Sequence, residues 1–321
     1  MATLNEIGIN GFSGLAPTPV QSYVINNYLK NSDLLNALRY VNIGLGTSLG
    51  NFIASVVVSD GSVEAVGRAL GTEYDAKNEE FRTENITLKM LGGSILTDVE
   101  IQRAFKSTVQ SVASAYTQNQ IEQRINAIEK CFAKWFINGD SSLDSKQFDG
   151  IEKFISTKAS SQVVSNPIDV SVLNETKALA ADKQLNEVVS LMGYEPTFIL
   201  TSRKGGAWLT TLNQYSHRAT EAVDFNSRKY KQYNGLPIVC VDDSCFKSTD
   251  LVDKYPIYFI YTNENNGVRV AIPNDGKIMV ILQPSFDGGN VTSKGTVEML
   301  AAPIFEKYAL AKTYITDKVA E

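Results

Sequence analysis

Few residues of this sequence have the types and spacing that chemistry needs. Serine or cysteine nucleophiles need a base beside them, and the only histidine, His217 in NQYSHRATEAVD, has no nucleophile elbow near it. Cys240 and Cys245 are separated by VDDS, but no second cysteine pair and no second histidine accompany them to complete a zinc site. Together with Cys131 they are predicted to be reduced thiols.

Three glycine-containing stretches resemble binding motifs without completing them. GLGTSLG at 44–50 lacks the Lys-Ser/Thr pair of a phosphate-binding loop and does not match G-x-G-x-x-G, which favours a hinge. SRKGGAWL at 202–209 could hold an anion at a helix start, but a simple turn is favoured. NGDSSLDSKQFD at 138–149 lacks the sixth-position glycine and closing glutamate of a calcium loop. The sequence therefore predicts no catalytic, metal or cofactor site.

Composition indicates a folded protein that does not hold nucleic acid by charge. Hydrophobic residues are 43% and charged residues 20% of the chain, enough to bury a sizeable core. The net charge of -5 argues against a lysine-rich surface that binds phosphates. The sequence shows no signal-peptide pattern at its start, and no apolar run approaches the roughly 18 residues of a membrane span. We expect no membrane association.

The elements that must position any site are dominated by one long helix. Residues 98–136 contain neither Pro nor Gly, and their apolar positions recur three or four apart, with Thr97 or Asp98 as the N-cap. Gly193 is the predicted C-cap of a second long helix. The other patterns predict helices at 20–40, 175–192 and 205–215, and strands at 51–60, 86–90, 162–172, 196–202, 234–243, 255–263, 267–273, 277–283 and, with a break, 296–316.

Residues 57–97 differ from the rest of the chain. From Asp60 to Lys89 they hold seven acidic and four basic residues, few bulky apolar residues, and glycine near both ends. A long charged hairpin without apolar surface for a core of its own should project from the body. We predict that these residues are too polar to fold back on their own subunit and are stabilised by adjoining copies.

The order of segments resembles that of the tailed-phage major capsid proteins of the Hong Kong 97 type. A long helix ending in FINGD is followed by FDGIEKFI, which we predict to be a short two-turn helix, as after the spine helix of that family. GRALGTEYDAKNEEFRTENITLKMLGGSILTDVEIQRAF is similar to its extended loop running into the spine helix. About residues 57–321 match in order and spacing, including ALAADKQLNEVVSLMGYEPTFILTSRKGGAWL, KYKQYNGLPIVCVDD, DKYPIYFIYTNENNGVRVAIP and the closing AAPIFEKYALAKTYITD.

The resemblance implies a Hong Kong 97-like α+β fold in several parts. Residues 1–56 would be an N-terminal arm and 57–97 an extended β-hairpin loop, both lying across neighbouring subunits. A peripheral domain would hold the spine helix in 98–172 together with 291–321. Residues 173–290 would be an axial α/β domain that points at the five- and six-fold axes.

The resemblance also implies which residues meet neighbouring copies. Glycine admits many backbone conformations, so hinges of the extended loop are expected at Gly71, Gly92 and Gly93. Contacts between subunits are expected from the extended-loop residues Arg68, Glu73, Tyr74, Asp75, Lys77, Glu79, Glu80, Phe81, Arg82 and Glu84.

The abrupt end of the spine helix at Asn138-Gly139 then becomes a structural corner, where the chain turns back under the helix. Burying a large side chain contributes about 1.5–3 kcal/mol, so a cluster of aromatic residues would hold the corner firmly. The expected clamp consists of Phe132, Trp135 and Phe136 on the helix and Phe148, Ile151 and Phe154 after it.

The role that the resemblance implies is structural and not enzymatic: a major capsid protein whose copies form an icosahedral shell around phage double-stranded DNA, without sequence-specific binding. Expected partners are further copies in pentamers and hexamers, a portal and decoration proteins. Because 56 residues precede the extended loop, a separate scaffolding protein is also expected. The expected location is the virion, assembled in the host cytoplasm, with no cofactor.

Two other functions stay open. An encapsulin-like nanocompartment shares this fold but holds enzyme cargo, and the contents of purified particles would distinguish it from a phage shell. A soluble enzyme with an unfamiliar site would instead behave as a discrete monomer with an apolar pocket.

Overall fold

The computed structural model describes residues 32–43, 46–48, 51–59, 81–98, 110–218, 220–223, 229–247, 254–273, 279–282 and 292–317. Its helices are α2 (Asp33–Ala37), α4 (Gln110–Asn138), α5 (Ile151–Lys158), α6 (Glu175–Ser190) and α7 (Arg203–Tyr215). Its strands are β1 (Arg39–Ile43), β2 (Gly46–Ser48), β3 (Asn51–Ser59), β4 (Phe81–Thr87), β5 (Lys89–Asp98), β6 (Ile168–Asp169), β7 (Phe198–Ser202), β8 (Glu221–Val223), β9 (Lys229–Tyr233), β10 (Leu236–Val241), β11 (Tyr255–Ile260), β12 (Arg269–Pro273), β13 (Met279–Leu282), β14 (Thr292–Ile304) and β15 (Leu310–Thr316).

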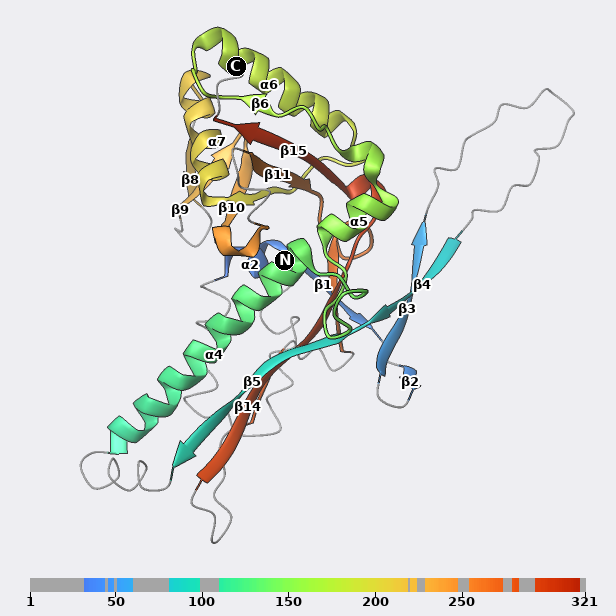
Figure 1. The fold of residues 1–321 in the computed structure, drawn as a ribbon, viewed down its shortest axis with the longest axis vertical. Coiled ribbons are helices and arrows are strands. Elements are labelled where there is room, and N and C mark those ends of the chain that lie inside the picture. The colour runs from blue at the N-terminus through green and yellow to red at the C-terminus, as the bar shows by residue number, and fades with distance from the viewer. Residues whose placement is uncertain are drawn as a thin grey trace, which may run out of the picture.

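A mixed seven-stranded sheet, in the order β6-β15-β11-β7-β10-β9-β8, forms one end of the molecule (Figure 1). Alternate residues of its central strands face opposite sides of a sheet, as the pleat requires. Ile199 and Phe259 enter the core under α6 and α7, whereas Leu200 and Tyr258 enter the core shared with α4 and α5. The central strands are buried on both faces, which accounts for their nearly unbroken apolar sequences.

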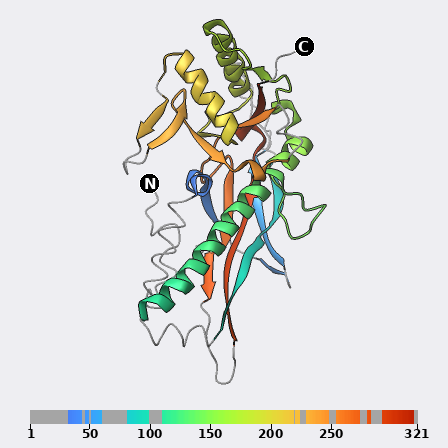
Figure 2. The same ribbon diagram turned by 60° about the vertical axis from the view of Figure 1, so that its left-hand side comes forward.

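The second body is a long sheet with α4 lying along it (Figures 1 and 2). β5 pairs with β14 over ten residues, and β14 pairs on its other side with β12 and β13. Ile121, Ile125 and Ile128 of α4 pack in one core cluster with Leu91 and Ile95 of β5. The apolar residues that recur three or four apart thus form the face of α4 that packs on the sheet.

A three-stranded sheet, β2-β3-β4, stands off this body. β3 and β4 pair antiparallel from Ile53↔Thr87 to Ser59↔Phe81, and Figure 1 shows both strands rising away from the rest of the chain. They are the two sides of a hairpin whose intervening residues, 60–80, lie outside the described residues.

Part of the prediction for 57–97 is wrong. Of the described residues in this range, only β4 and the last three residues of β3 (57–59) belong to the projecting hairpin, and β3 begins before residue 57. From Leu88 onward the chain returns to the body: Leu88, Leu91 and Ile95 are buried, and β5 pairs with β14 of the same chain. These residues are stabilised by their own subunit because Leu91 and Ile95 enter its core and their strand pairs with a partner that is distant in sequence.

The predicted helix ends are corrected in three places. Thr97 and Asp98 are not N-cap residues, because both belong to β5. The predicted helix 20–40 fails at its end, where α2 stops at Ala37 and β1 begins at Arg39; residues 20–31 lie outside the described residues. α6 has its C-cap at Leu191, and Gly193 instead donates its N–H to the Tyr308 carbonyl at 2.9 Å.

The sheet pairing cuts across the predicted domain boundaries. β12 and β13, from the predicted axial domain 173–290, pair with β14, whereas β15, from the peripheral 291–321, pairs with β11 in the seven-stranded sheet. The predicted strand 162–172 is reduced to β6 and an isolated bridge at Val163. Pairing between segments distant in the sequence decides which sheet each strand joins, and the local sequence does not indicate that pairing.

Most other elements are where the sequence predicts them. The strand patterns of β3, β7, β10, β11, β12, β13, β14 and β15 are confirmed, as are α5, α6 and α7. The Asn-Gly pair predicted to lead into β10 forms the β9–β10 turn, with positive φ at both Asn234 and Gly235. Within the described residues, no helix has the length and apolar character needed to cross a membrane.

Candidate assembly site

The corner after α4 is built around a close approach of two glycines. Gly139 donates its N–H to the Trp135 carbonyl at 2.8 Å, and Gly150 donates to the Gly139 carbonyl at 2.9 Å. A Cβ on Gly139 would lie 2.5 Å from the Trp135 oxygen and closer still to the Phe148 oxygen. A Cβ on Gly150 would meet the same Trp135 oxygen. The helix ends at Asn138 because the returning chain crosses its last turn where only glycine fits.

The predicted clamp residues come together around this crossing. The Phe148 ring lies 5.6 Å from that of Phe132 and 5.7 Å from that of Trp135, centroid to centroid. Phe136 and Phe154 do not stack on each other but on a shared ring, that of Phe305, at 5.5 and 5.4 Å. Ile151 is fully buried in the same core.

Phe305 is the clamp residue that the sequence reasoning missed. It directly follows the last residue of β14, so it brings the C-terminal strand to the end of the long helix. Its neighbours in the sequence, APIFEK, indicate only a strand end. Aromatic pairs at these distances contribute about 0.5–1.5 kcal/mol beyond the area that they bury.

The acidic residues of the corner loop hold its turns and do not form a cation site. Asp140 accepts a hydrogen bond from the Ser142 N–H at 2.9 Å and pairs with Lys153 at 3.1 Å. Asp149 accepts from the Ser141 N–H at 2.8 Å, and Asp144 from the Lys146 N–H at 3.0 Å. The hydrogen bond from the Ser142 side chain, with those from Lys153 and the backbone, lowers the pKa of Asp140 to about 2.

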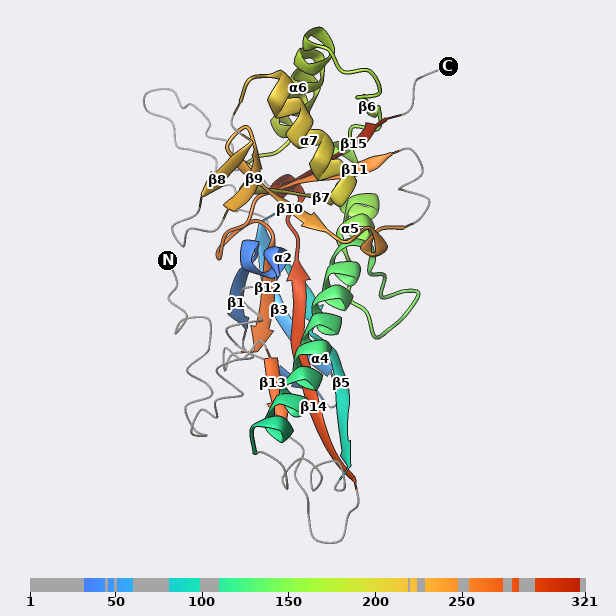
Figure 3. The same ribbon diagram turned by 90° about the vertical axis from the view of Figure 1, so that its left-hand side faces the viewer.

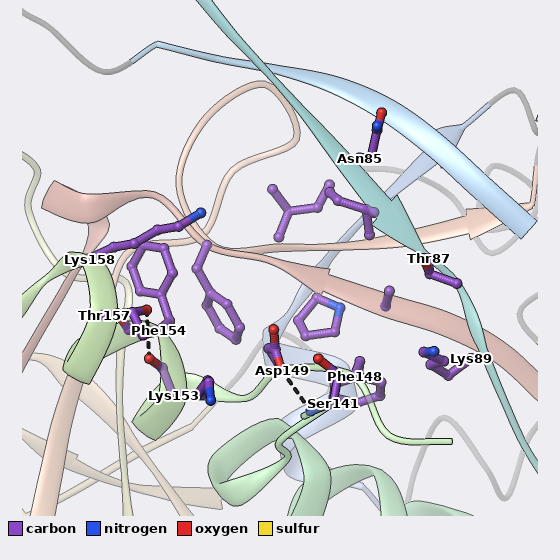
Figure 4. Close-up of a pocket in the computed structure, with 15 residues that line it drawn as sticks. Asn85, Thr87, Lys89, Ser141, Phe148, Asp149, Lys153, Phe154, Thr157 and Lys158 are labelled. Carbon is purple, nitrogen blue, oxygen red and sulfur yellow. Dashed lines mark hydrogen bonds between the residues drawn. The ribbon is translucent and has the colours of Figure 1, made fainter. Parts of the chain in front are cut away.

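A groove of about 750 Å³ opens between this corner and the base of the hairpin (Figure 4). Its walls are the last residues of β4, the corner loop, α5 and the end of β14. Lys89 and Lys158 lie at its edges, and Lys89 donates to the Ser145 carbonyl at 2.7 Å, which ties the start of β5 to the corner loop. We name it the corner groove. The corner groove lies between the base of the projecting hairpin and the corner.

A buried ion pair fixes the other side of α5. The Lys312 ammonium on β15 donates to Glu152 Oε1 at 2.6 Å, and the Tyr258 hydroxyl donates to the same oxygen. The Lys312 side chain is 4% exposed and lies over the rings of Tyr258 and Tyr314. Burial alone would lower the pKa of Lys312, but the Glu152 carboxylate more than offsets this and raises it.

A third charged group lies under β1. The pKa of Tyr40 is raised, chiefly by burial and to a smaller extent by the charge of Glu129 on α4. The Tyr40 hydroxyl donates to the Leu35 carbonyl at 2.8 Å, and Glu129 Oε1 is buried without a hydrogen-bond partner among the described residues. This burial raises the pKa of Glu129 to about 7.

Glu129 should therefore make stability depend on pH. Its folded-state pKa lies above its ordinary value of 4.5, so the folded state holds the proton more tightly and this stability is complete below about pH 4.5. The contribution is lost as the pH rises through 7. We expect Glu129→Gln to raise the melting temperature at pH 8 and to change it little at pH 4.5. Glu187→Gln, at an exposed position of α6, is the control; equal shifts in both variants would contradict the prediction.

The residues that could do chemistry do not gather in one place. His217 is an exposed turn residue after α7, with a φ of 52°. Cys131, Cys240 and Cys245 are free thiols, and burial raises the pKa of each. In the described part of the chain, no group of three metal-ligating side chains comes together.

The predicted extended-loop contacts fall largely outside the described residues. This holds for Arg68, Glu73, Tyr74, Asp75, Lys77, Glu79 and Glu80, and for the predicted hinge Gly71. Phe81, Arg82 and Glu84 belong to β4. Gly92 and Gly93 lie inside β5, where a Cβ on Gly92 would meet the Val297 oxygen and one on Gly93 the Arg124 side chain. Close packing against backbone is thus a sufficient reason for glycine at 92, whereas at 93 the flexible Arg124 side chain could move aside.

Several solved structures share this arrangement of elements. The SrpI encapsulin of Synechococcus elongatus PCC 7942 is 12% identical, with a TM-score of 0.59 and coverage of 90% of this chain and 89% of that chain. The capsid of an empty GTA particle is 14% identical, with a TM-score of 0.54 and coverage of 90% of both chains. Mycobacterium phage Adephagia gives 15% identity, a TM-score of 0.52 and coverage of 91% and 92%.

No protein family and no curated protein matches the sequence. At these low identities the structural likeness establishes the fold alone. The chain has a mixed α+β fold of the Hong Kong 97 type, as the order of its sequence segments predicts.

Proposed function

We propose that this chain is a major capsid protein, whose copies form an icosahedral shell around the double-stranded DNA of a tailed phage. The observation that carries the proposal is a Hong Kong 97 type fold that spans about nine tenths of this chain and of each compared chain. A hairpin stem that stands off the body supports it further. The role is mechanical and needs no active site.

The mechanism rests on contacts spread over several neighbours. A projecting hairpin reaches beyond its own subunit, so each copy can hold more than one other copy, and weak contacts combine by multivalency into a stable closed shell. The copies would be arranged as pentamers and hexamers, with the seven-stranded sheet and its helices near the symmetry axes. A separate scaffolding protein, a portal and decoration proteins would complete the virion, which assembles in the host cytoplasm.

The extended-loop residues named from the sequence, from Arg68 to Glu84, are the proposed contacts between subunits. The hydrogen bond from Lys89, just after the stem, to the Ser145 carbonyl of the corner loop would help to keep the hairpin stem in a fixed direction. DNA would be enclosed without sequence-specific binding, consistent with the net charge of -5.

An encapsulin-like shell that holds enzyme cargo is the second candidate. It is favoured by the TM-score of 0.59 to the SrpI encapsulin, which is above those of the two other structures compared. Purified particles decide between the two: nuclease-protected DNA supports the capsid, and a co-purifying enzyme inside the particles supports the encapsulin.

The hairpin offers a direct test of assembly. Ser59 and Phe81 are paired at the end of the stem, so an Asn-Gly turn can replace residues 60–80 with the geometry of a two-residue hairpin. We expect this variant to be soluble, to melt within a few degrees of the unmodified chain, and to form no closed particles in negative-stain micrographs. Normal particles from the variant would show that residues 60–80 have no role in assembly.

A further inference from the structure

A second groove, of about 770 Å³, lies between α2, the start of α7, β9 and β10. Its lining includes Ala37, Phe198 and Pro237, and its charged residues are Arg39, Arg203, Lys229 and Lys231, opposed by Asp33. All four basic residues are exposed. We name it the cationic groove.

The charge of this groove is opposite to that of the protein. The whole chain has a net charge of -5, yet four basic residues and one acidic residue line the groove. Arg203 pairs with Asp242 at 3.6 Å, while in the described part of the chain no acidic side chain lies within ion-pair distance of Arg39, Lys229 or Lys231. A concentration of unpaired positive charge on an acidic protein favours an acidic partner.

The groove and the hairpin lie on opposite flanks of the molecule. In Figure 1 the elements that form the groove are on the left and the β3–β4 stem is on the right; Figure 3 looks onto the groove side. A contact between two different surfaces of identical copies is head-to-tail, and such contacts generate closed rings when the rotation closes. With the hairpin on one flank and the cationic groove on the other, one copy can present its hairpin to the groove of the next copy in such a ring.

The charges of the two long undescribed segments near the N-terminus, 1–31 and 60–80, distinguish between them as occupants of the groove. Residues 1–31, which lead directly into α2, have only two charged side chains, Glu6 and Lys30. Their charges cancel, so this segment cannot neutralise the groove. Residues 60–80 between the hairpin strands contain two basic residues, Arg68 and Lys77, and six acidic ones: Asp60, Glu64, Glu73, Asp75, Glu79 and Glu80. We propose that the cationic groove binds the acidic segment 60–80 of a second copy of this chain.

This proposal rests on the proposed shell function and deepens it, since it names the surface that receives the hairpin. The first test treats assembled particles with a zero-length carbodiimide, which joins carboxylates to lysine ammonium groups in contact. We expect peptides that link Lys229 or Lys231 to residues 60–80, present in particles and absent from the unassembled chain. Links from 60–80 that consistently reach other lysines in particles would overturn the proposal.

Charge reversal supplies the second test. Lys229→Glu/Lys231→Glu should reduce the assembled fraction about tenfold at low salt, because attraction at every copy of the contact becomes repulsion. Adding Glu79→Lys/Glu80→Lys should restore assembly, whereas Lys183→Glu, exposed on α6, should have no effect. Full assembly of the Lys229→Glu/Lys231→Glu variant would overturn the proposal that the cationic groove binds residues 60–80 of a second copy. It would not contradict the proposed shell function. A wild-type chain that forms no particles, either alone or with the proposed scaffolding protein, would overturn both.

Discussion

Gly139→Ala should prevent the corner after α4 from forming and should destabilise the chain by about 3 kcal/mol, near the upper end of overpacking costs. The added Cβ would press on the carbonyl oxygens of Trp135 and Phe148, which are backbone atoms and cannot turn aside as a side chain can. Relieving the overlap requires moving the last turn of α4 away from the returning chain. Phe148 then leaves the rings of Phe132 and Trp135.

The measurement is urea unfolding of the unassembled chain, with limited proteolysis at the 140–149 loop as a local readout. Gly235→Asn is the matched control, because Gly235 has a φ of 82° with no atom within 4 Å of its Cβ position, and asparagine tolerates that conformation. Because any side chain at this positive φ is strained to some degree, we expect the control to unfold slightly below the wild-type midpoint and well above Gly139→Ala. A wild-type midpoint for Gly139→Ala would show that the glycine crossing does not hold the corner.

Local patterns predicted the elements of this fold well because each pattern has a local cause. β-branched and aromatic runs predicted β7 and β11, and the strand predicted to start at Asn234-Gly235 is β10. The end of the long helix at Asn138 and the short helix after it followed from the same reasoning. Five of the six predicted clamp residues were found in the same way. Each of these five contacts a ring, or lies in a buried core, formed with residues close to it in the sequence.

Pairing between distant segments could not be predicted in this way. Lys89–Asp98 lie in a strand because β14, some two hundred residues later, supplies the partner, and without that knowledge the glycines at 92 and 93 look like a break. Phe305 joined the clamp for the same reason. The two grooves show most clearly what local patterns cannot predict. Both are lined by segments far apart in the sequence, and the sequence alone gives only the charges of those segments.

The buried pair of Glu152 and Lys312 is a further case of pairing at long range. The two residues are 160 positions apart, and ALAKTYIT indicates a strand without showing that its lysine is buried. Taking an ammonium out of water is costly unless a carboxylate compensates it, and Glu152 does so at 2.6 Å. The pair attaches α5, and with it the corner, to the seven-stranded sheet.

Glu152→Leu should consequently lower the free energy of unfolding by about 3–5 kcal/mol, because it leaves the buried Lys312 charge without a carboxylate partner. Adding Lys312→Met removes that charge and should recover most of the loss. The exposed pair of Lys177 and Asp169, at 3.0 Å, is the control, and Lys177→Ala should cost no more than about 1 kcal/mol. Urea unfolding of the four proteins measures the differences. If Glu152→Leu costs no more than Lys177→Ala, the pair does not join α5 to the sheet, and the corner is held by its aromatic clamp alone.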